Sequence, residues 1–252
     1  MKVNIAGIKM SNPTMLASGM MGETGGSLVQ VADHGAGAVV TKSIGSSSRE
    51  GYKNPTLFES ESYFVNAMGL PGPGIEEFGL EMKAAVKGKT PVIGSIFASS
   101  PKEFADLATS MVEYGASGIE LNLSCPHAKG YGMEMGIDPE MVTKIVREVK
   151  AAVSVPVLSK LTPNTHRLVE VAKAVEEAGG DGLVAINTVK AMAISVEFRR
   201  PVLSNKYGGL SGPAVKPIGL RCVYELYENV SIPIIGVGGV MNWRDALEYV
   251  MA

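Results

Sequence analysis

The chain has 252 residues, a formal net charge of −2 and a hydrophobic fraction of 46%. This length suits one large α/β domain or two small ones, and we expect a single domain over residues 1–252. The near-neutral charge and the lack of a long Lys/Arg block argue against a nucleic-acid surface. No segment resembles a signal peptide, and no apolar run is long enough to cross a bilayer.

Cysteine and histidine are scarce, with two cysteines and three histidines in the whole chain. Cys222 lies in a predicted helix, so we expect no bridge to Cys125, and two such cysteines form no disulfide framework. This fits a reducing, cytoplasmic setting. Neither an HxxxH nor a CxxC spacing occurs, so we predict no metal site built from protein ligands.

Strands and helices are predicted to alternate along the chain. Residues 2–10 read as a small hairpin with Gly7 at its turn. Seven runs rich in Val, Ile and Leu follow, as expected of strands buried on both faces of a parallel sheet; they are residues 14–18, 38–42, 91–97, 119–123, 156–160, 182–187 and 232–237. Helices are predicted over residues 27–34, 101–114, 139–153, 166–178 and 215–228, and one begins near Asn242.

Alternating βα units predict either a doubly wound sheet or a (β/α)8 barrel. A doubly wound sheet concentrates its site at one switch point. Here nearly every strand ends in a polar residue or glycine: Ser18, Lys42, Ser95, Asn122, Lys160, Asn187 and Gly238. A site supplied by every strand favours an α/β fold of the (β/α)8 TIM-barrel type, with the N-terminal hairpin capping its bottom. Because only seven strands precede Ala252, we expect the eighth βα unit to be missing.

A thiol and an amide end the fourth predicted strand. The apolar, β-prone run over residues 118–123 includes Asn122, and Ser124, Cys125 and Pro126 follow it. The mouth of an α/β barrel is where its chemistry takes place, and a thiol of lowered pKa can act as a base or nucleophile. The alternative is a half-buried structural cysteine, and this segment alone does not decide between them.

Two lysines and two asparagines also lie at the ends of predicted strands. A lysine at a buried strand end is costly unless it meets a carboxylate or a ligand, so Lys42 and Lys160 indicate ligand contacts; the alternative is a solvated position. Asn122 and Asn187 each offer a donor and an acceptor, which suits the amide edge of a flavin or a pyrimidine. Either asparagine could instead cap a turn.

The sequence Gly-Val-Gly-Gly at residues 236–239 follows the seventh strand and precedes a helix. Backbone N–H groups at a helix N-terminus form an anion site, and in a barrel this is the usual position of a phosphate; the alternative is a tight turn. Two long insertions contain residues 66–71 and 207–213. We interpret them as a functional lid or wall, or else as a flexible cover.

Eight segments carry a resemblance to a known family: residues 12–19, 41–43, 66–70, 121–126, 160–164, 186–188, 208–212 and 236–239. Together, and in this order, they resemble the class 1 dihydroorotate dehydrogenase family over nearly the whole chain. The resemblance implies an FMN-binding barrel that oxidises (S)-dihydroorotate to orotate in de novo pyrimidine (UMP) biosynthesis.

The resemblance also implies roles by position. Cys125 would be the general base that takes the C5 proton, while hydride passes from C6 to flavin N5. Lys160 would act electrostatically beside flavin N1 and O2. The substrate would contact Lys42, Asn66, Met68, Gly69, Leu70, Asn122, His127, Asn187 and Thr188. The FMN would be lined by Ala17, Ser18, Gly19, Lys42, Ser43, Ser95, Asn122, Lys160, Ile186, Gly212, Gly238 and Gly239.

Position 127 departs from the family pattern, because His127 stands where asparagine usually follows Cys-Pro. A histidine there is similar to the dihydropyrimidine dehydrogenase branch, which reduces uracil and thymine; such an activity is the alternative function. Residues 128–136 lack that branch's pattern and look closer to archaeal dihydroorotate dehydrogenases. A non-catalytic flavin barrel is a third hypothesis, because a missing eighth unit would leave two strand edges unpaired.

The resemblance points to the catalytic subunit of the NAD-linked type 1B enzyme. In that type a partner subunit carries FAD and an iron–sulfur cluster and passes electrons to NAD. Two cysteines cannot supply such a cluster, so a partner would be required; a fumarate-linked enzyme would need none. We expect a homodimer or a heterotetramer, with no nucleic-acid or membrane partner.

Overall fold

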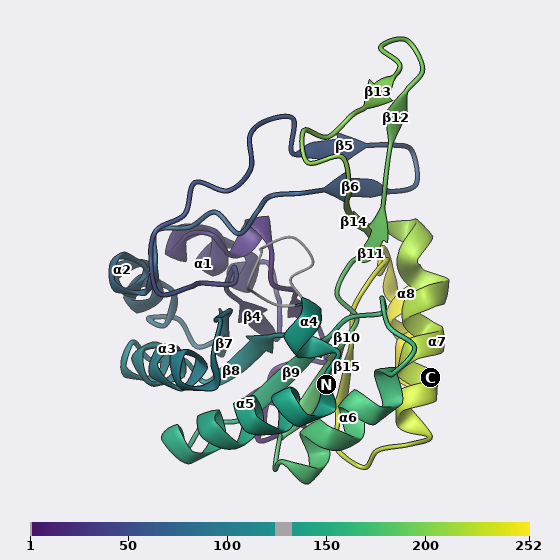
Figure 1. Cartoon of the computed structure of the whole chain (residues 1–252). Helices are drawn as coiled ribbons and strands as arrows, with labels where there is room; N and C mark the ends of the chain where they lie inside the picture. Colours follow the sequence, from purple (N-terminus) through teal and green to yellow (C-terminus); the bar gives the residue numbers. More distant parts are fainter. Residues whose placement is uncertain (1, 124–132) are drawn as a thin grey trace.

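The computed structural model describes residues 2–123 and 133–252. Its centre is a curled sheet of seven parallel strands in the order β15-β10-β9-β8-β7-β4-β3 (Figure 1). The strands are β3 (Met15–Leu16), β4 (Ala38–Val40), β7 (Val92–Ile96), β8 (Gly118–Asn122), β9 (Val157–Leu161), β10 (Gly182–Ala185) and β15 (Ile234–Gly236). Each predicted strand is confirmed, either shortened by two or three residues or shifted by one.

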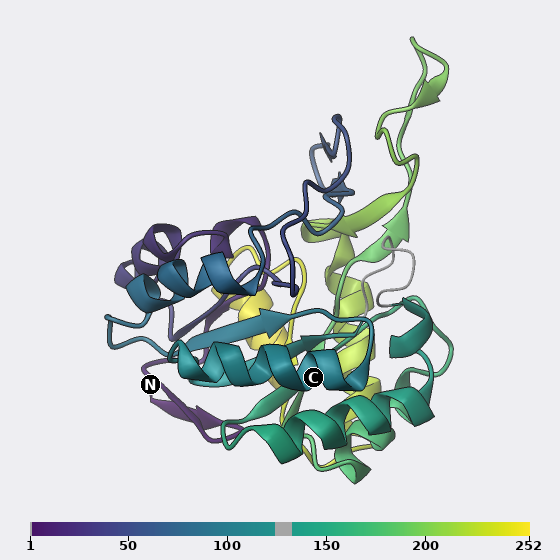
Figure 2. The same ribbon diagram turned by 60° about the vertical axis from the view of Figure 1, so that its left-hand side comes forward.

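Helices cover the outer face of this sheet (Figures 1 and 2). In α5, for example, the buried Val142, Ile145, Val146 and Val149 recur at helical spacing, so one stripe faces the strands. The helices are α1 (Gly25–Asp33), α2 (Ile75–Ala85), α3 (Pro101–Glu113), α4 (Met133–Gly136), α5 (Pro139–Ala152), α6 (Leu168–Glu177), α7 (Lys216–Tyr227) and α8 (Trp243–Met251), with 3₁₀ turns η1 (Met20–Gly22) and η2 (Pro213–Val215).

The predicted N-terminal hairpin is confirmed. Strands β1 (Val3–Ile5) and β2 (Ile8–Met10) pair antiparallel around Gly7, whose φ of 90° is a left-handed value that suits glycine. Ile8 and Met10 are buried against the inward-facing Val40, Ile93, Leu158 and Val184 of the central sheet. The hairpin therefore closes the amino-terminal end of the curled sheet.

The two long insertions hold structure that the sequence did not reveal. Their strands form an antiparallel sheet above the carboxyl ends of the central strands, in the order β11-β14-β6-β5. A second hairpin projects from the body (Figure 2). The strands are β5 (Leu57–Glu59), β6 (Phe64–Asn66), β11 (Val189–Ala191), β12 (Ile194–Ser195), β13 (Arg200–Pro201) and β14 (Gly208–Ser211). Residues 66–71 and 207–213 thus belong partly to a paired wall.

The central sheet curls without closing. In the described part of the chain β3 pairs only with β4, and β15 pairs only with β10. These two strands are therefore the edges of the seven-stranded sheet. Because the seven strands are parallel, their carboxyl ends lie on one rim, and that rim holds the candidate site.

Candidate active site

A network of hydrogen bonds joins side chains from five strand ends on this rim. Ser95 Oγ donates to Glu120 Oε1 at 2.9 Å, and Ser43 Oγ lies 2.9 Å from Ser95 Oγ. Asn122 Nδ2 donates to Ser43 Oγ at 2.9 Å, and Asn187 Nδ2 donates to Asn122 Oδ1 at 3.3 Å. Ser18 Oγ lies 3.3 Å from Ser43 Oγ. Five residues predicted to belong to the site are therefore brought together, with Glu120 as an added member.

Strand register explains why Lys160 lies beside this hydrogen-bond network. Asn122 of β8 lies opposite Lys160 of β9, and Glu120 lies opposite Leu158. Alternate residues of a strand face the same side, so Glu120, Asn122 and Lys160 all point into the curl. Lys160 Nζ lies 3.7 Å from Glu120 Oε1, and the two residues are 5% and 2% exposed.

Sequence reasoning missed Glu120, although a signal was available. A carboxylate is almost never fully buried unless it is paired. Here one acidic residue stands within the apolar run that ends at Asn122, on the same inward face as a buried lysine of the next strand. Glu120 is therefore the carboxylate partner that the buried Lys160 was expected to require.

Lys42 also meets a carboxylate. It follows β4 and is buried, and its Nζ lies 2.8 Å from Oε1 of Glu23, whose side chain is about half exposed. The backbone fixes this approach, because Lys42 N donates to Gly22 O at 2.8 Å. A Cβ on Gly22 would lie 2.6 Å from Lys42 N, so only glycine fits there. The expected ligand contact of Lys42 stays a prediction.

The antiparallel wall carries Asn66 to the same region. Asn66 Nδ2 donates to Gly209 O at 3.4 Å, and a Cβ on Gly209 would lie 2.1 Å from Thr188 Oγ1. Thr188 directly follows Asn187, and its N–H donates to Asn187 Oδ1 at 2.7 Å. Asn66 and Thr188 thus both lie against Gly209, beside the polar chain. The other predicted members, Met68, Gly69 and Leu70, form the turn after β6, where Gly69 and Leu70 have φ values of 78° and 56°.

Glycines form a second cluster on the rim. Gly212, Gly238 and Gly239 have φ values of 89°, 125° and 68°, and a Cβ on Gly239 would lie 3.0 Å from Gly212 O. In the described residues, the amides of Gly238, Gly239 and Val240 donate no hydrogen bond. They immediately precede α8, so three open N–H groups and a helix N-terminus lie together, which suits an anion.

Side chains of α8 hold this glycine loop in place. The Tyr249 hydroxyl donates to Gly238 O at 2.8 Å, and burial raises the pKa of Tyr249 to about 12. Asp245 accepts from the N–H groups of Met241 and Asn242 at 2.9 and 3.1 Å. Lys216 Nζ lies 2.6 Å from Asp245, and this contact lowers the pKa of the Asp245 carboxyl. Tyr249 and Asp245 are supporting residues that sequence reasoning did not identify.

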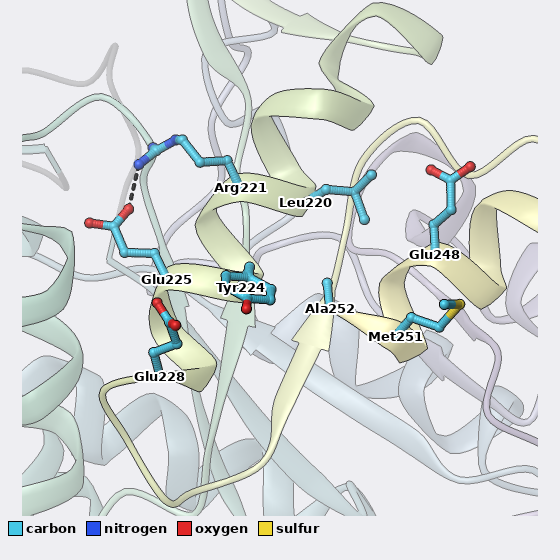
Figure 3. A pocket seen from close by; sticks show the side chains of 8 residues that line it. All are labelled: Leu220, Arg221, Tyr224, Glu225, Glu228, Glu248, Met251 and Ala252. Atoms are coloured by element: carbon cyan, nitrogen blue, oxygen red, sulfur yellow. Dashed lines mark hydrogen bonds and ion pairs between the residues drawn. The ribbon is translucent and has the colours of Figure 1, made fainter.

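A cavity of about 1090 Å³ is lined by Glu120 of the polar network and by the glycine cluster. It lies in the gap between the edges of β3 and β15, and its lining includes Ala17, Glu120, Gly212, Gly238 and Gly239. A separate cavity of about 730 Å³ lies on the outer surface between α7 and α8, where Arg221 pairs with Glu225 (Figure 3). None of the predicted site residues lines that second cavity.

Other predicted residues take simpler positions. Ile186 is buried and its N–H donates to Val237 O at 3.2 Å, beside the glycine loop. Gly19 precedes the turn η1. Cys125 and His127 fall outside the described residues, so their roles stay predictions. Among the described residues, no group of three or more His, Cys, Asp or Glu could hold a metal ion, and no helix is long and apolar enough to span a membrane.

Comparison with known proteins identifies the family. A family model described as dihydroorotate dehydrogenase matches residues 1–252. The chain belongs to the dihydroorotate dehydrogenase family.

Curated relatives agree with this assignment, and a solved structure matches the fold. The chain is 54% identical over 248 residues to the "Dihydroorotate dehydrogenase B (NAD(+)), catalytic subunit" of Thermoplasma volcanium, covering 98% of this chain and 82% of the relative. Proteins of the same description from Methanocella arvoryzae and Pyrococcus abyssi are each 53% identical, with 99% and 100% of this chain and 82% and 84% of the relative covered. A crystal structure of DHODH from Eimeria tenella in complex with ferulenol matches the fold. Its TM-score is 0.84 at 19% identity, covering 99% of this chain and 75% of that one.

Proposed function

We propose that this chain is an FMN-dependent enzyme that oxidises (S)-dihydroorotate to orotate in de novo pyrimidine biosynthesis. The observation that carries the proposal is the buried polar chain from Glu120 through Ser95 and Ser43 to Asn122 and Asn187. It lies on the rim of a curled parallel sheet, in a member of the dihydroorotate dehydrogenase family. Relatives about half identical carry this enzyme's name.

The residues present fit FMN at both of its ends. The open amides of Gly238, Gly239 and Val240 at the N-terminus of α8 suit the phosphate. The buried ammonium of Lys160 and the amide of Asn122 suit the polar edge of the ring system. Because Gly238 and Gly239 have no Cβ, a phosphate group can approach their backbone closely.

The reaction removes a proton from C5 and a hydride from C6, and a C5=C6 double bond forms. FMN, when bound, supplies the acceptor for the hydride. Cys125 takes the proton as a thiolate base. The amides of Asn66, Asn122 and Asn187 orient the pyrimidine ring through its carbonyl and N–H groups, and Lys42 offers a cation for the substrate carboxylate.

Position 127 bears on the substrate. Placed beside the base, His127 would bind the carboxylate of dihydroorotate as an imidazolium or hydrogen-bond the loop that covers it. The roles of Met68, Gly69 and Leu70 as a substrate wall, and of Ala17, Ser18 and Gly19 against the flavin, complete the proposed site. These contacts rest on the family resemblance together with their position on the same rim.

We also propose that the chain works as a catalytic subunit with an electron-transfer partner that carries FAD and an iron–sulfur cluster. The relatives' names support this, because they describe catalytic subunits of an NAD(+) enzyme. A cytoplasmic homodimer of the chain, or a heterotetramer with that partner, is the assembly we expect. Co-purification with a flavin and iron–sulfur subunit tests it; full turnover with fumarate in the absence of that subunit contradicts it.

Steady-state turnover of the FMN-containing protein tests the substrate. With an artificial electron acceptor, we expect orotate to form from dihydroorotate, followed by its absorbance, and dihydrouracil to be left unchanged. Turnover of dihydrouracil alone would favour the dihydropyrimidine dehydrogenase type of activity. Binding of FMN without turnover of either compound would favour a non-catalytic flavin barrel.

A further inference from the structure

We infer that Glu120 is a positioning residue that fixes the direction of each hydrogen bond leading to Asn122 and so sets which atoms Asn122 offers to a bound pyrimidine. This inference rests on the proposed function. Glu120 is buried and lies inside the curl, beneath the predicted ligand-binding residues. Among the described residues, two serine hydroxyl groups link it to Asn122.

The direction follows from donor and acceptor counts. A carboxylate can only accept, so Ser95 Oγ must donate its one proton to Glu120. Ser95 can then only accept from Ser43, which uses the single proton of Ser43. Ser43 Oγ must therefore accept from Asn122 Nδ2 at 2.9 Å, and also from Ser18 Oγ at 3.3 Å.

The Asn187 end of the hydrogen-bond network independently imposes the same orientation on the Asn122 amide. The N–H of Thr188 can only donate, so Asn187 turns its Oδ1 toward it at 2.7 Å. The Nδ2 of Asn187 is thereby left to face Asn122 Oδ1 at 3.3 Å. Both ends thus require Asn122 to direct Nδ2 toward Ser43 and Oδ1 toward Asn187. A reversed Asn122 amide would place two donors against each other at one side.

Burial makes this arrangement costly to change. Ser95, Ser43, Glu120 and Asn122 are all buried, and a mismatched polar group in such surroundings costs far more than it would in water. The Glu120 charge is balanced by Lys160 at 3.7 Å, whereas the other nearby cation, Lys42, pairs with Glu23 at 2.8 Å. Glu120 therefore touches the site through two routes, a neutral one to Asn122 and a charged one to Lys160.

Two variants test these routes. Ser95→Ala removes the hydroxyl route and keeps the Glu120–Lys160 pair. Glu120→Gln keeps the shape and removes the charge, and because a glutamine amide can donate as well as accept, it no longer obliges Ser95 to donate. The matched control is Ser159→Ala. Ser159 is fully buried on β9, and its hydroxyl has no hydrogen-bond partner in the described structure, so its loss should leave the site unchanged.

The first readout needs no substrate. In the ¹⁵N-labelled, FMN-containing protein, we expect the side-chain NH2 protons of Asn122 to exchange with solvent at least tenfold faster in Ser95→Ala and Glu120→Gln than in Ser159→Ala. The signal is assigned from its loss in Asn122→Asp. Equal exchange rates in all three variants would overturn the inference, whether or not the protein oxidises dihydroorotate.

The second and third readouts distinguish positioning from a general structural effect. We expect orotate to bind at least tenfold more weakly to both Ser95→Ala and Glu120→Gln, as followed by perturbation of the flavin spectrum. Only Glu120→Gln should raise the FMN midpoint potential, because it removes a negative charge beside Lys160. Unchanged orotate affinity in both variants, in a wild-type protein that does oxidise dihydroorotate, would overturn the inference and leave the proposed function standing.

Discussion

Replacing Tyr249 with phenylalanine tests whether one hydroxyl group holds the glycine loop in its anion-binding shape. That hydroxyl donates to Gly238 O at 2.8 Å and lies 3.4 Å from Val237 O. Because burial raises the pKa of Tyr249 to about 12, the hydroxyl keeps its proton at any ordinary assay pH. Phenylalanine keeps the ring that packs against the loop, so the substitution removes the hydrogen bond and little else.

The expected magnitude follows from that single bond. The N–H of Gly239 points opposite to the Gly238 carbonyl across a planar trans peptide, so fixing the carbonyl on Tyr249 aims the N–H toward the anion site. A hydrogen bond contributes about 0.5–1.5 kcal/mol net. If that energy is lost from the binding-competent loop, the Kd for FMN rises about 2- to 12-fold, since about 1.4 kcal/mol corresponds to tenfold.

Quenching of flavin fluorescence measures this change, and two controls sharpen it. Tyr224→Phe alters an exposed tyrosine on α7 whose hydroxyl makes no hydrogen bond within the described residues, so its Kd for FMN should equal that of the wild type. Riboflavin lacks the phosphate, so Tyr249→Phe should weaken FMN binding and leave riboflavin binding unchanged. Equal FMN affinity in both tyrosine variants, or an equal loss for riboflavin, would refute the reasoning.

Three further substitutions test other parts of the account. Lys160→Met leaves the buried Glu120 without its counter-charge, so urea unfolding should show a loss of about 3–5 kcal/mol; adding Glu120→Gln should recover most of it, and a single variant as stable as the wild type would contradict the pairing. Cys125→Ser should cut the rate of dihydroorotate oxidation sharply at neutral pH and recover partly at high pH, because an alcohol is a weaker base; an unaltered pH–rate profile would remove Cys125 from the mechanism. Lys216 lowers the pKa of Asp245 below 3.8, so the stability that this contact adds is fully present above pH 3.8 and is lost as the pH falls through the folded-state pKa. Asp245→Asn should therefore lower the unfolding free energy at pH 7, and its difference from the wild type should shrink below pH 4; a difference independent of pH would exclude this linkage.

Local patterns in the sequence predicted the central sheet well. Five of the seven strands (β4, β7, β8, β9 and β10) are buried along their whole length, as their mainly apolar composition indicates. The edge strands β3 and β15 are apolar but only partly buried. The helix α2 was not identified, because it follows a long Gly- and Pro-rich segment and its N-cap residue, Gly74, has no side chain to cap it. Its buried Ile75, Phe78 and Met82 nevertheless recur at helical spacing.

The antiparallel wall was not predictable in the same way. Its strands are three or four residues long, and they pair across large separations, as when Asn66 of β6 lies opposite Gly209 of β14. Such short strands carry no periodicity, and only their partners stabilise them. The insertions therefore read as loops in the sequence.

For the site, the sequence indicated which polar residues end the strands but not how they connect. Ser95, Asn122 and Lys160 are confirmed as neighbours on one rim. Glu120 and Glu23 were not recognised as the partners of the two buried lysines, because pairing depends on strand register and on the path of the loop after β3. Long-range pairing of this kind is fixed by tertiary structure.

Reduction of the bound flavin by dihydroorotate shows most directly whether this chain oxidises that substrate. Dihydroorotate is added without oxygen to the purified protein with FMN bound, and the visible flavin absorbance is followed. We expect this absorbance to bleach and one orotate to form for each flavin reduced. Flavin that stays oxidised in the presence of excess dihydroorotate would contradict the proposed function.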